Sequence, residues 1–282
     1  MASRNYHRHA IEPFGRELIT SGDLDPVYNA ITGAGWDMET RCRWMVAYWC
    51  FYHSGFACYA AQFKGAHFWD ALQVAAENTT PNPYNERWPR GSERRHFRAD
   101  AATRAIEELS KQYAHAADMV SFCAGPEPHT TFAAINKRAK THRGFGAWMG
   151  FKIADMIDRC TPVEVDFELG HLFMFKDPEK AATMQWTLTH PGEELAPRQQ
   201  RLTEVVTALI AEFSDLKAPP NGDRPVGIPE VETVLCKWKS HMNGHYPLYH
   251  DTREIRKQVI DWASVSPLST SFLQALPYGD QQ

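Results

Sequence analysis

The sequence lacks a membrane-spanning run, a signal peptide and a paired cysteine motif. Its richest apolar stretch, residues 44–63, is interrupted by His53, Ser54 and Gly55, whereas a span needs about 20 apolar residues. The N-terminal residues 1–17 have no apolar core of the kind that signal peptides carry. The six cysteines include no Cys-x-x-Cys pair, which argues against zinc ribbons and iron–sulfur clusters. These absences predict a cytoplasmic protein with reduced thiols and no membrane partner.

A uniformly positive charge is also missing. The formal net charge is −4 over 282 residues, which argues against a generally basic nucleic-acid binder. Two segments nevertheless concentrate cations: residues 87–104 hold six arginines against two acidic residues, and residues 136–144 read NKRAKTHRG. Two local basic patches on a mildly acidic chain fit a groove for a polyanion. Solvated helix ends explain the same charge pattern equally well.

Alternating strand patterns are nearly absent, and the only short candidate is LGHLFMF at residues 169–175. Helical periodicity dominates instead. Loops rich in proline and glycine separate the periodic segments, and none is long or polar enough to be a flexible tether. The sequence therefore predicts an all-α protein, with residues 1–282 forming one compact unit of two helical lobes. The expected helices cover residues 38–62, 99–121, 129–140, 147–159 and 200–216, and two more begin near Pro229 and Asp251.

The stretch from Gly144 to Asp166, GFGAWMGFKIADMIDRCTPVEVD, carries the most information. Its Gly-x-Gly turn joins two expected helices into a helix–hairpin–helix at about residues 129–159. Glycines let the backbone approach a ligand closely, and the start of the second helix offers free N–H groups to a phosphate. Glycines between helices are more often simple caps, but the adjoining cations and Asp166 favour DNA binding here. The expected DNA contacts are Gly144, Gly146, Lys137, Lys140, Arg143 and Lys152.

This motif resembles the helix–hairpin–helix DNA glycosylase superfamily. Members carry a pattern like L-P-G-V-G-x-K-T-A followed by V-D-T-H, with the aspartate 22 residues after the first glycine. Gly144, Gly146 and Asp166 occupy those positions. The resemblance implies a glycosylase-like fold, with the active site between the two lobes and Asp166 as the catalytic carboxylate. Trp148 stands where some members have their Schiff-base lysine, so lyase chemistry through that amine is not expected.

The segment GFGAWMGFKIADMI is also similar to phage-type amino acid:DNA transferases, the α-glutamyl/putrescinyl-thymine pyrophosphorylases, which are regarded as a glycosylase-derived branch. Residues 43–55, 90–100 and 232–244 share this resemblance, which then spans most of the chain. It implies an enzyme that displaces pyrophosphate from 5-(pyrophosphoryloxymethyl)uracil in DNA with the amine of an amino acid. Its partners would be double-stranded DNA containing modified thymine and a free amino acid, in the bacterial host cytoplasm if a phage encodes the chain.

Asp166 is the candidate for the central step of that reaction. It would orient and deprotonate the amine, or stabilise the cationic carbon left as pyrophosphate departs. A base working near neutral pH needs a raised pKa, and therefore partial burial. Capping of a following helix is the structural alternative for this aspartate.

The leaving pyrophosphate calls for arginines, whose guanidinium groups match phosphate oxygens in bidentate fashion. Arg95 and Arg98 are the first candidates and Arg90 and Arg94 the second; a solvated face is the rival explanation for each. Mg²⁺ could share this role, and no other cofactor and no metal site is expected. Glu232 and Lys237 are weaker candidates for holding the ammonium and carboxylate of the amino acid.

Two further interpretations and two other functions stay open at this stage. Asp155 is better explained by a salt bridge on its helix than by chemistry. Four aromatic residues could line a base pocket, although such residues are usually core: Tyr48, Trp49, Phe51 and Tyr52. The alternative functions are a monofunctional glycosylase that excises a modified base and a non-catalytic DNA-binding protein.

Overall fold

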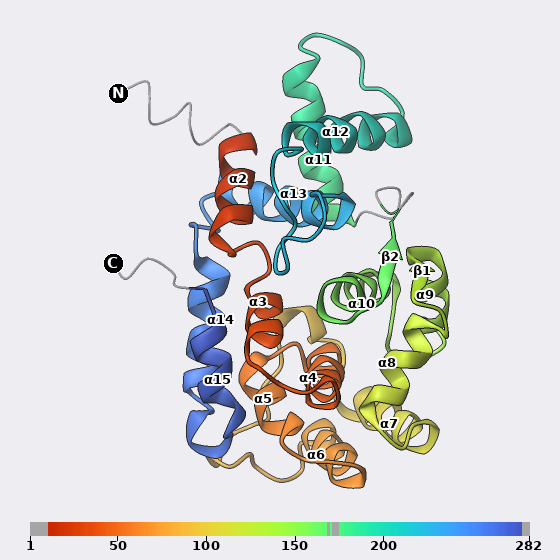
Figure 1. The fold of residues 1–282 in the computed structure, drawn as a ribbon, viewed down its shortest axis with the longest axis vertical. Helices are drawn as coiled ribbons and strands as arrows, with labels where there is room; N and C mark the ends of the chain where they lie inside the picture. Colours follow the sequence, from red (N-terminus) through yellow and green to blue (C-terminus); the bar gives the residue numbers. More distant parts are fainter. Residues whose placement is uncertain (1–10, 168–169, 171–174, 278–282) are drawn as a thin grey trace. The chain divides into compact units, whose positions relative to one another are not determined.

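The computed structural model describes residues 11–167, 170 and 175–277, and these residues are predominantly helical (Figure 1). The predicted all-α fold is confirmed. Among the helices of these residues, none combines the length and the apolar character needed to cross a membrane. The strand candidate at residues 169–175 lies largely outside the described residues.

The chain divides into two compact units. Unit 1 comprises residues 1–26, 167–252 and 277–282, and unit 2 comprises residues 27–166 and 253–276. The chain passes from unit 2 to unit 1 directly after Asp166. That residues 1–282 form a single glycosylase-like catalytic unit, with its active site between two lobes, stays a prediction.

Unit 2 contains most of the helices and both short strands. In chain order they are α3 (Pro26–Gly33), α4 (Met38–Phe51), α5 (Ser54–Ala61), α6 (Ala66–Glu77), the 3₁₀ turn η1 (Ser92–Arg94), α7 (Ala99–Gln112), α8 (Ala116–Ala124), β1 (His129–Thr131), α9 (Phe132–Ala139), α10 (Ala147–Cys160), β2 (Glu164–Asp166), η3 (Ala263–Val265) and α15 (Leu268–Ala275). A further helix, α14 (His250–Ile260), begins in unit 1 and continues into unit 2.

The centre of unit 2 is α4, which packs against α5, α8 and α10. Its buried aromatic side chains explain why the sequence looks apolar on every face of this helix. The prediction of one helix over residues 38–62 is wrong, however. Tyr52 adopts a left-handed conformation (φ 51°), and His53 then starts α5, its Nδ1 accepting the N–H of Phe56 at 3.1 Å. The expected helix over residues 99–121 is likewise divided, with α7 ending at Gln112 and α8 beginning at Ala116.

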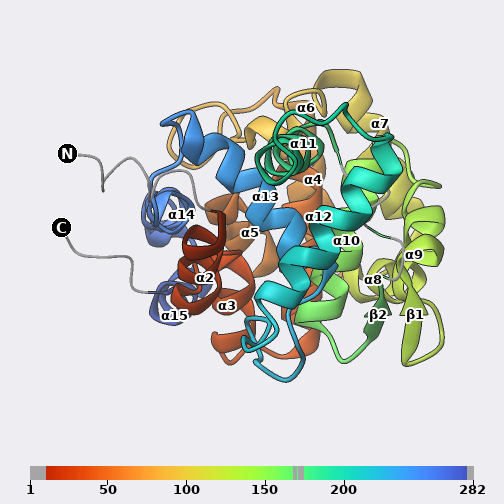
Figure 2. The same cartoon turned by 90° about the horizontal axis from the view of Figure 1, so that it is seen from above.

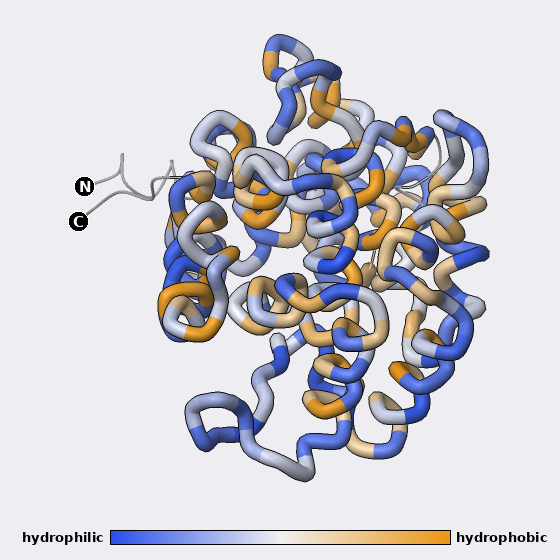
Figure 3. Tube along the Cα trace, turned by 60° about the horizontal axis from the view of Figure 1, so that its bottom comes forward, coloured by the Kyte–Doolittle hydropathy of each residue, from blue (hydrophilic) through white to orange (hydrophobic). Residues whose placement is uncertain are grey.

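Unit 1 is built around α13 (Ile228–Met242), which packs against α2 (Ile11–Ser21), α11 (Lys176–Thr189) and α12 (Arg198–Glu212) (Figure 2). Its core contains Phe14, Trp186, Phe213 and Trp238. Hydrophobic and hydrophilic residues alternate along the helical tubes, as amphipathic helices require (Figure 3). The helices expected over residues 200–216, near Pro229 and near Asp251 are confirmed.

The two strands of unit 2 pair in parallel, with His129 opposite Glu164 and Thr131 opposite Asp166. Each strand has only three residues, too few for the alternation that marks a strand in sequence. The sequence therefore missed both.

Candidate functional site

The expected hairpin is present in unit 2 as α9, a turn over residues 140–146, and α10. The strand pair lies at its open end, because β1 leads into α9 and β2 follows α10 (Figure 1). Thr131 caps α9 by accepting the N–H of Ala134 at 3.1 Å. Since Asp166 pairs with Thr131, the strand register ties this carboxylate to the start of the hairpin.

The structure requires glycine at one of the two glycine positions of the turn and leaves the other open to larger residues. Gly144 has a φ of 78°, and a Cβ placed on it would lie 2.9 Å from the ring of Phe97, so conformation and packing both require glycine. Gly146 has an extended backbone that other residues adopt, and a Cβ there would meet nothing within 4 Å. Gly146 precedes α10 and supplies no side-chain cap. The turn therefore leaves open space at Gly146, directly before α10, and a helix start is a suitable place for an anion.

Three of the four predicted DNA-binding cations lie at the surface of this hairpin. Lys137 and Lys140 are exposed, and the exposed Arg143 donates from Nε to Glu108 at 2.7 Å. Lys152 differs, because only 12% of its side chain is exposed and its Nζ lies 3.4 Å from the carboxylate of Asp155. This burial argues against a direct phosphate contact by Lys152.

Arg94 joins the arginine segment to the turn of the hairpin. Its Nε donates to the carbonyl of Cys50 at 3.1 Å, and its Nη1 donates to the carbonyl of Gly144 at 2.8 Å. The guanidinium also lies 4.1 Å from the ring centre of Phe97 and 5.1 Å from that of Phe145. Burial lowers the pKa of Arg94 to about 10, so it remains charged at neutral pH. Arg94 is thus a part of the scaffold and a poor candidate for binding pyrophosphate.

Arg90 is committed to the scaffold in the same way. Its Nη2 donates to the carbonyls of Ala75 and Ala76 at 2.9 and 3.3 Å, and its Nη1 donates to the carbonyl of Phe97. Burial, with smaller contributions from Arg98 and Arg94, lowers the pKa of Arg90 to about 10. The prediction of Arg90 as a pyrophosphate ligand therefore loses its support, because its donors point at backbone carbonyls.

Arg95 and Arg98 are the exposed arginines of the same segment among the four that the sequence singled out. Arg95 makes one long bond, from Nη1 to the carbonyl of Ser92 at 3.4 Å, and Arg98 is the N-cap residue of α7. Because Arg94 binds Gly144, these two guanidinium groups belong to a segment that is anchored to the hairpin turn. Of the four predicted pyrophosphate ligands, they are the two that a ligand can reach.

The four predicted aromatic residues of α4 and its C-terminus have two fates. Trp49 and Phe51 are fully buried core residues, so they cannot line a base pocket, and Tyr48 is a buried core residue as well. Tyr52 is half-buried, and its ring packs against Tyr48 at 4.4 Å and against Trp148 at 5.2 Å between centroids. An aromatic pair therefore lies beside the first turn of α10.

The predicted carboxylates also separate into two kinds. Asp155 pairs with Arg159 on its helix at 2.9 Å and accepts the hydroxyl of Tyr28 at 2.6 Å, so the predicted salt bridge is present. The expectation that it lies on the helix surface is wrong, because both partners are buried. Asp166 is exposed. The partial burial that a base would need is therefore not seen at Asp166 among the described residues.

The weaker candidates for amino-acid binding lie on α13 in unit 1. Lys237 is buried, and its Nζ donates to the carbonyl of Asp23 at 2.6 Å and pairs with Asp251 at 2.8 Å. Lys237 thus ties α13 to the first turn of α14, which argues against a role in holding a ligand. Glu232 is half-buried on the same helix.

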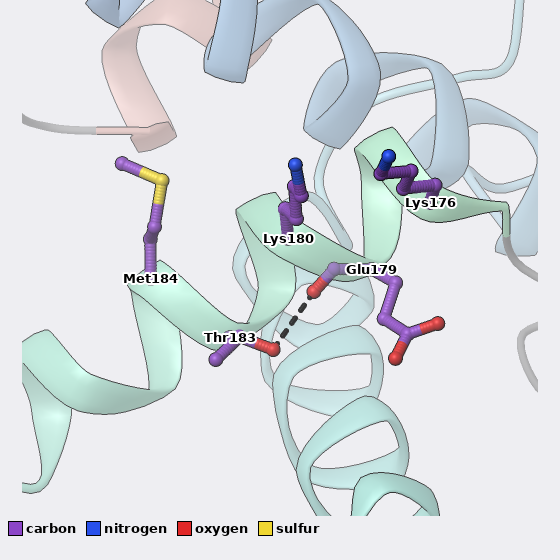
Figure 4. Close-up of a pocket in the computed structure, with 5 residues that line it drawn as sticks. All are labelled: Lys176, Glu179, Lys180, Thr183 and Met184. Carbon is purple, nitrogen blue, oxygen red and sulfur yellow. Dashed lines mark hydrogen bonds between the residues drawn. The ribbon is translucent and has the colours of Figure 1, made fainter.

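Two cavities occur in the described part of unit 1. One, of about 560 Å³, runs along α11, where Lys176, Lys180 and Met184 extend to one side of the helix (Figure 4). The other, of about 460 Å³, is lined by residues of α2, α11 and α12; in it the Trp186 indole N–H donates to Glu204 at 2.8 Å. The described residues that line them include none of the predicted site residues.

The sequence pattern of the amino acid:DNA transferase family matches residues 19–245 of this chain. The chain belongs to this family. A glycinyltransferase of Pseudomonas phage PaMx11 is 45% identical over 98% of both chains. A putrescinyltransferase of Delftia phage PhiW-14 is 29% identical, over 79% of this chain and 69% of that protein. The chain is therefore an enzyme, a transferase that moves an amino acid onto bases of DNA, as the sequence resemblance predicted.

The sequence missed Phe97, which helps to build the candidate site. Phe97 is buried between Arg94 and the two hairpin residues Gly144 and Phe145. An aromatic residue within a segment rich in arginine was the available signal, since guanidinium groups pack on aromatic faces. Attention to charge alone overlooked it.

Proposed function

We propose that this transferase joins the amine of glycine to 5-(pyrophosphoryloxymethyl)uracil in double-stranded DNA and releases pyrophosphate. The choice of glycine is supported by the glycinyltransferase that shares 45% identity over nearly the whole chain. The structural observation that carries the proposal is the bond from Arg94 to the carbonyl of Gly144. It anchors a segment bearing two exposed arginines, Arg95 and Arg98, to a turn that is open to a phosphate.

DNA binding is assigned to the hairpin. One backbone phosphate occupies the open space at Gly146, directly before α10, because the start of a helix offers N–H groups and a partial positive charge. The exposed Lys137, Lys140 and Arg143 contact neighbouring phosphates. Such contacts position the enzyme without reading sequence. The target base leaves the stack, because its reacting carbon must meet glycine in a site on the protein.

The chemical step replaces one bond by another at the exocyclic methylene carbon. The C–O bond to pyrophosphate breaks, and its electron pair leaves on the pyrophosphate oxygen. The C–N bond to glycine forms, and the nitrogen gives up its protons to solvent. Arg95 and Arg98 neutralise the departing pyrophosphate. Asp166, which is exposed, holds the glycine ammonium, or a cationic carbon, by its negative charge.

The test is a reaction of the enzyme with DNA that contains 5-(pyrophosphoryloxymethyl)uracil. Glycine, other amino acids and putrescine are supplied separately, with and without Mg²⁺. Mass analysis of the digested nucleosides should find a glycine adduct, together with an equal amount of free pyrophosphate. Asp166→Asn should lose most of this activity while binding DNA normally. No adduct with any amine would overturn the proposal, and alkali-labile abasic sites would instead indicate a glycosylase.

A further inference from the structure

Tyr52 occupies a backbone conformation that suits glycine better than tyrosine. It ends α4 with φ 51° and ψ 44°, in the left-handed region. Bulky L-residues are rare there because Cβ crowds the backbone, and helices that end this way usually place glycine at this point. Strained residues of this kind cluster at functional sites. The chain thus carries a large aromatic side chain where the backbone alone would favour none.

The neighbouring segments hold Tyr52 in this conformation. Its N–H donates to the carbonyl of Tyr48 at 2.6 Å. Gly91, at the start of the arginine segment, donates its N–H to the carbonyl of Phe51 at 2.8 Å. A Cβ on Gly91 would lie 2.3 Å from the carbonyl oxygen of Tyr52, so only glycine permits this close approach. The segment that carries Arg95 therefore also braces Tyr52.

The aromatic rings form a series that runs from the core to a half-buried pair. Trp44 and Tyr48 are buried and stacked at 4.7 Å, and Tyr48 is followed by Tyr52 at 4.4 Å. The Tyr52 ring then meets Trp148 at 5.2 Å and an angle of 60°. Tyr52 and Trp148 are both half-buried. The inner rings support the outer pair, so its faces are fixed before any ligand arrives.

This pair lies next to the helix start that the proposed function assigns to a DNA phosphate. Trp148 follows Gly146 by two residues, a rise of about 3 Å along α10. A nucleotide whose phosphate is bound at Gly146 would therefore have an aromatic surface close to its base. Stacking on aromatic rings tolerates any base and is the usual way in which proteins hold an unpaired one.

We infer that Tyr52 and Trp148 form the surface that receives the target pyrimidine after it leaves the duplex, and that the strained turn at Tyr52 aims its ring. The inference rests on the proposed function for the identity of the base, a 5-substituted uracil. It adds two base-binding residues to a site otherwise described by phosphate and pyrophosphate contacts.

Equilibrium binding to two duplexes tests this inference without pyrophosphate or glycine. One duplex is fully paired, and the other carries a single bulged thymine. The wild-type enzyme should prefer the bulged duplex, and Tyr52→Gly should lower that preference by roughly 10- to 100-fold. Affinity for the paired duplex should not change, and the melting temperature should change little, because relief of the left-handed strain offsets the ring contacts that are lost. Tyr52→Phe should keep the preference, since it keeps the ring.

Asn85→Gly is the matched control, because Asn85 is exposed and also left-handed (φ 64°); it should leave both affinities unchanged. If Tyr52→Gly fails to fold, Tyr52→Leu replaces it, keeping bulk while removing the aromatic face. Retention of the preference by Tyr52→Gly or Tyr52→Leu would overturn the inference, as would a wild-type enzyme that shows none. An equal loss of both affinities with a lowered melting temperature would reduce Tyr52 to a packing residue. A missing glycine adduct would contradict the proposed function but leave this result valid.

Discussion

The arginine segment and the basic run of the hairpin look alike in sequence but divide their cations in an instructive way. In each, some guanidinium groups bind carbonyls in the last turn of a helix: Arg90 at the end of α6, Arg94 at the end of α4, and Arg138 at the end of α8. The remaining cations that the sequence singled out in these segments are exposed. A local cluster of positive charge thus contains two groups of side chains: those that bind helix ends and stabilise the fold, and those that stay exposed and are available to a ligand.

Arginines that bind the carbonyls of helix ends also occur outside these two segments. Arg43 donates to the carbonyl of Ala61 at the end of α5, and Arg41 donates to that of Cys160 at the end of α10. Terminal carbonyls lack a helical partner and carry partial negative charge, so a cation there is favourable. Charge clustering alone therefore overestimates the number of ligand contacts. The useful question about each arginine is whether a helix ends beside it.

The largest effect expected from this division is on stability, at Arg94. Arg94→Ala leaves two carbonyls in a buried region without their donor and opens space between Phe97 and Phe145. The free energy of unfolding should fall by about 2–4 kcal/mol, as measured by urea denaturation. The adjacent Arg95→Ala is the control and should change stability by less than about 0.5 kcal/mol. Equal stability losses in the two variants would contradict the division.

Arg95 and Arg98 should show the opposite behaviour, with an effect on catalysis and none on the fold. Each loss removes a charge-assisted bond to the departing pyrophosphate, which corresponds to roughly a 10- to 100-fold fall in kcat/KM. Steady-state assays of pyrophosphate release measure it. Arg→Lys at the same positions should restore only part of the activity, since lysine lacks the bidentate fork. Full activity of both alanine variants would place the pyrophosphate elsewhere.

His53 also belongs to the side chains that bind the end of a helix, but it does so in its neutral form. Burial lowers the pKa of His53 to about 4 from its ordinary 6.5, and its Nδ1 accepts the N–H of Phe56. Between pH 4 and pH 6.5, His53 is protonated in the unfolded chain but stays neutral in the folded chain. The contribution of neutral His53 to the free energy of unfolding is therefore complete above pH 6.5 and is lost as the pH falls toward 4. The loss between pH 7 and pH 5 should be about 2 kcal/mol.

Urea unfolding at the two pH values checks this expectation. His53→Asn keeps a capping acceptor and does not titrate, so its stability should depend less on pH than that of the wild type. His142, whose pKa burial also lowers, contributes with the same sign in both proteins and cancels from the difference. The same pH dependence in both proteins would show that His53 is not the group responsible.

The sequence predicted the positions of the helices better than the hydrogen-bond partners of their polar side chains. The stripe of α12 and the glycine turn at Gly144 follow from spacing within one segment. The role of Arg94 depends on Cys50, 44 residues away in the chain, and no local pattern encodes that distance. The break at Tyr52 was hidden because α4 and α5 are both buried, which leaves a continuous apolar run. Local periodicity thus predicts elements, whereas tertiary contacts decide which charged side chains remain for a ligand.

The two glycines of the hairpin allow a smaller and sharper test. Gly146→Ala places a methyl group in the space assigned to a phosphate, and apart from the adjoining residues no protein atom lies within 4 Å of it. DNA affinity should therefore fall by about tenfold while the melting temperature changes little. In Gly144→Ala the added Cβ would clash with the ring of Phe97, and alanine would have to adopt a φ of 78°. The substitution should therefore destabilise the fold by about 1–3 kcal/mol. Normal DNA affinity in Gly146→Ala would remove the phosphate from this position.

The smallest effects are expected from the exposed lysines and appear in the salt dependence of DNA binding. Lys137→Ala and Lys140→Ala should each reduce the slope of log K against log salt by about one, equally for all DNA sequences. Lys111→Ala is the control, because Lys111 is exposed in the same unit but paired with Glu107 at 2.6 Å on α7. Arg143 shares its charge with Glu108, so its loss should change the slope less than that of either lysine. An unchanged slope in both lysine variants would mean that the exposed cations of the hairpin, unlike its helix start, do not face DNA.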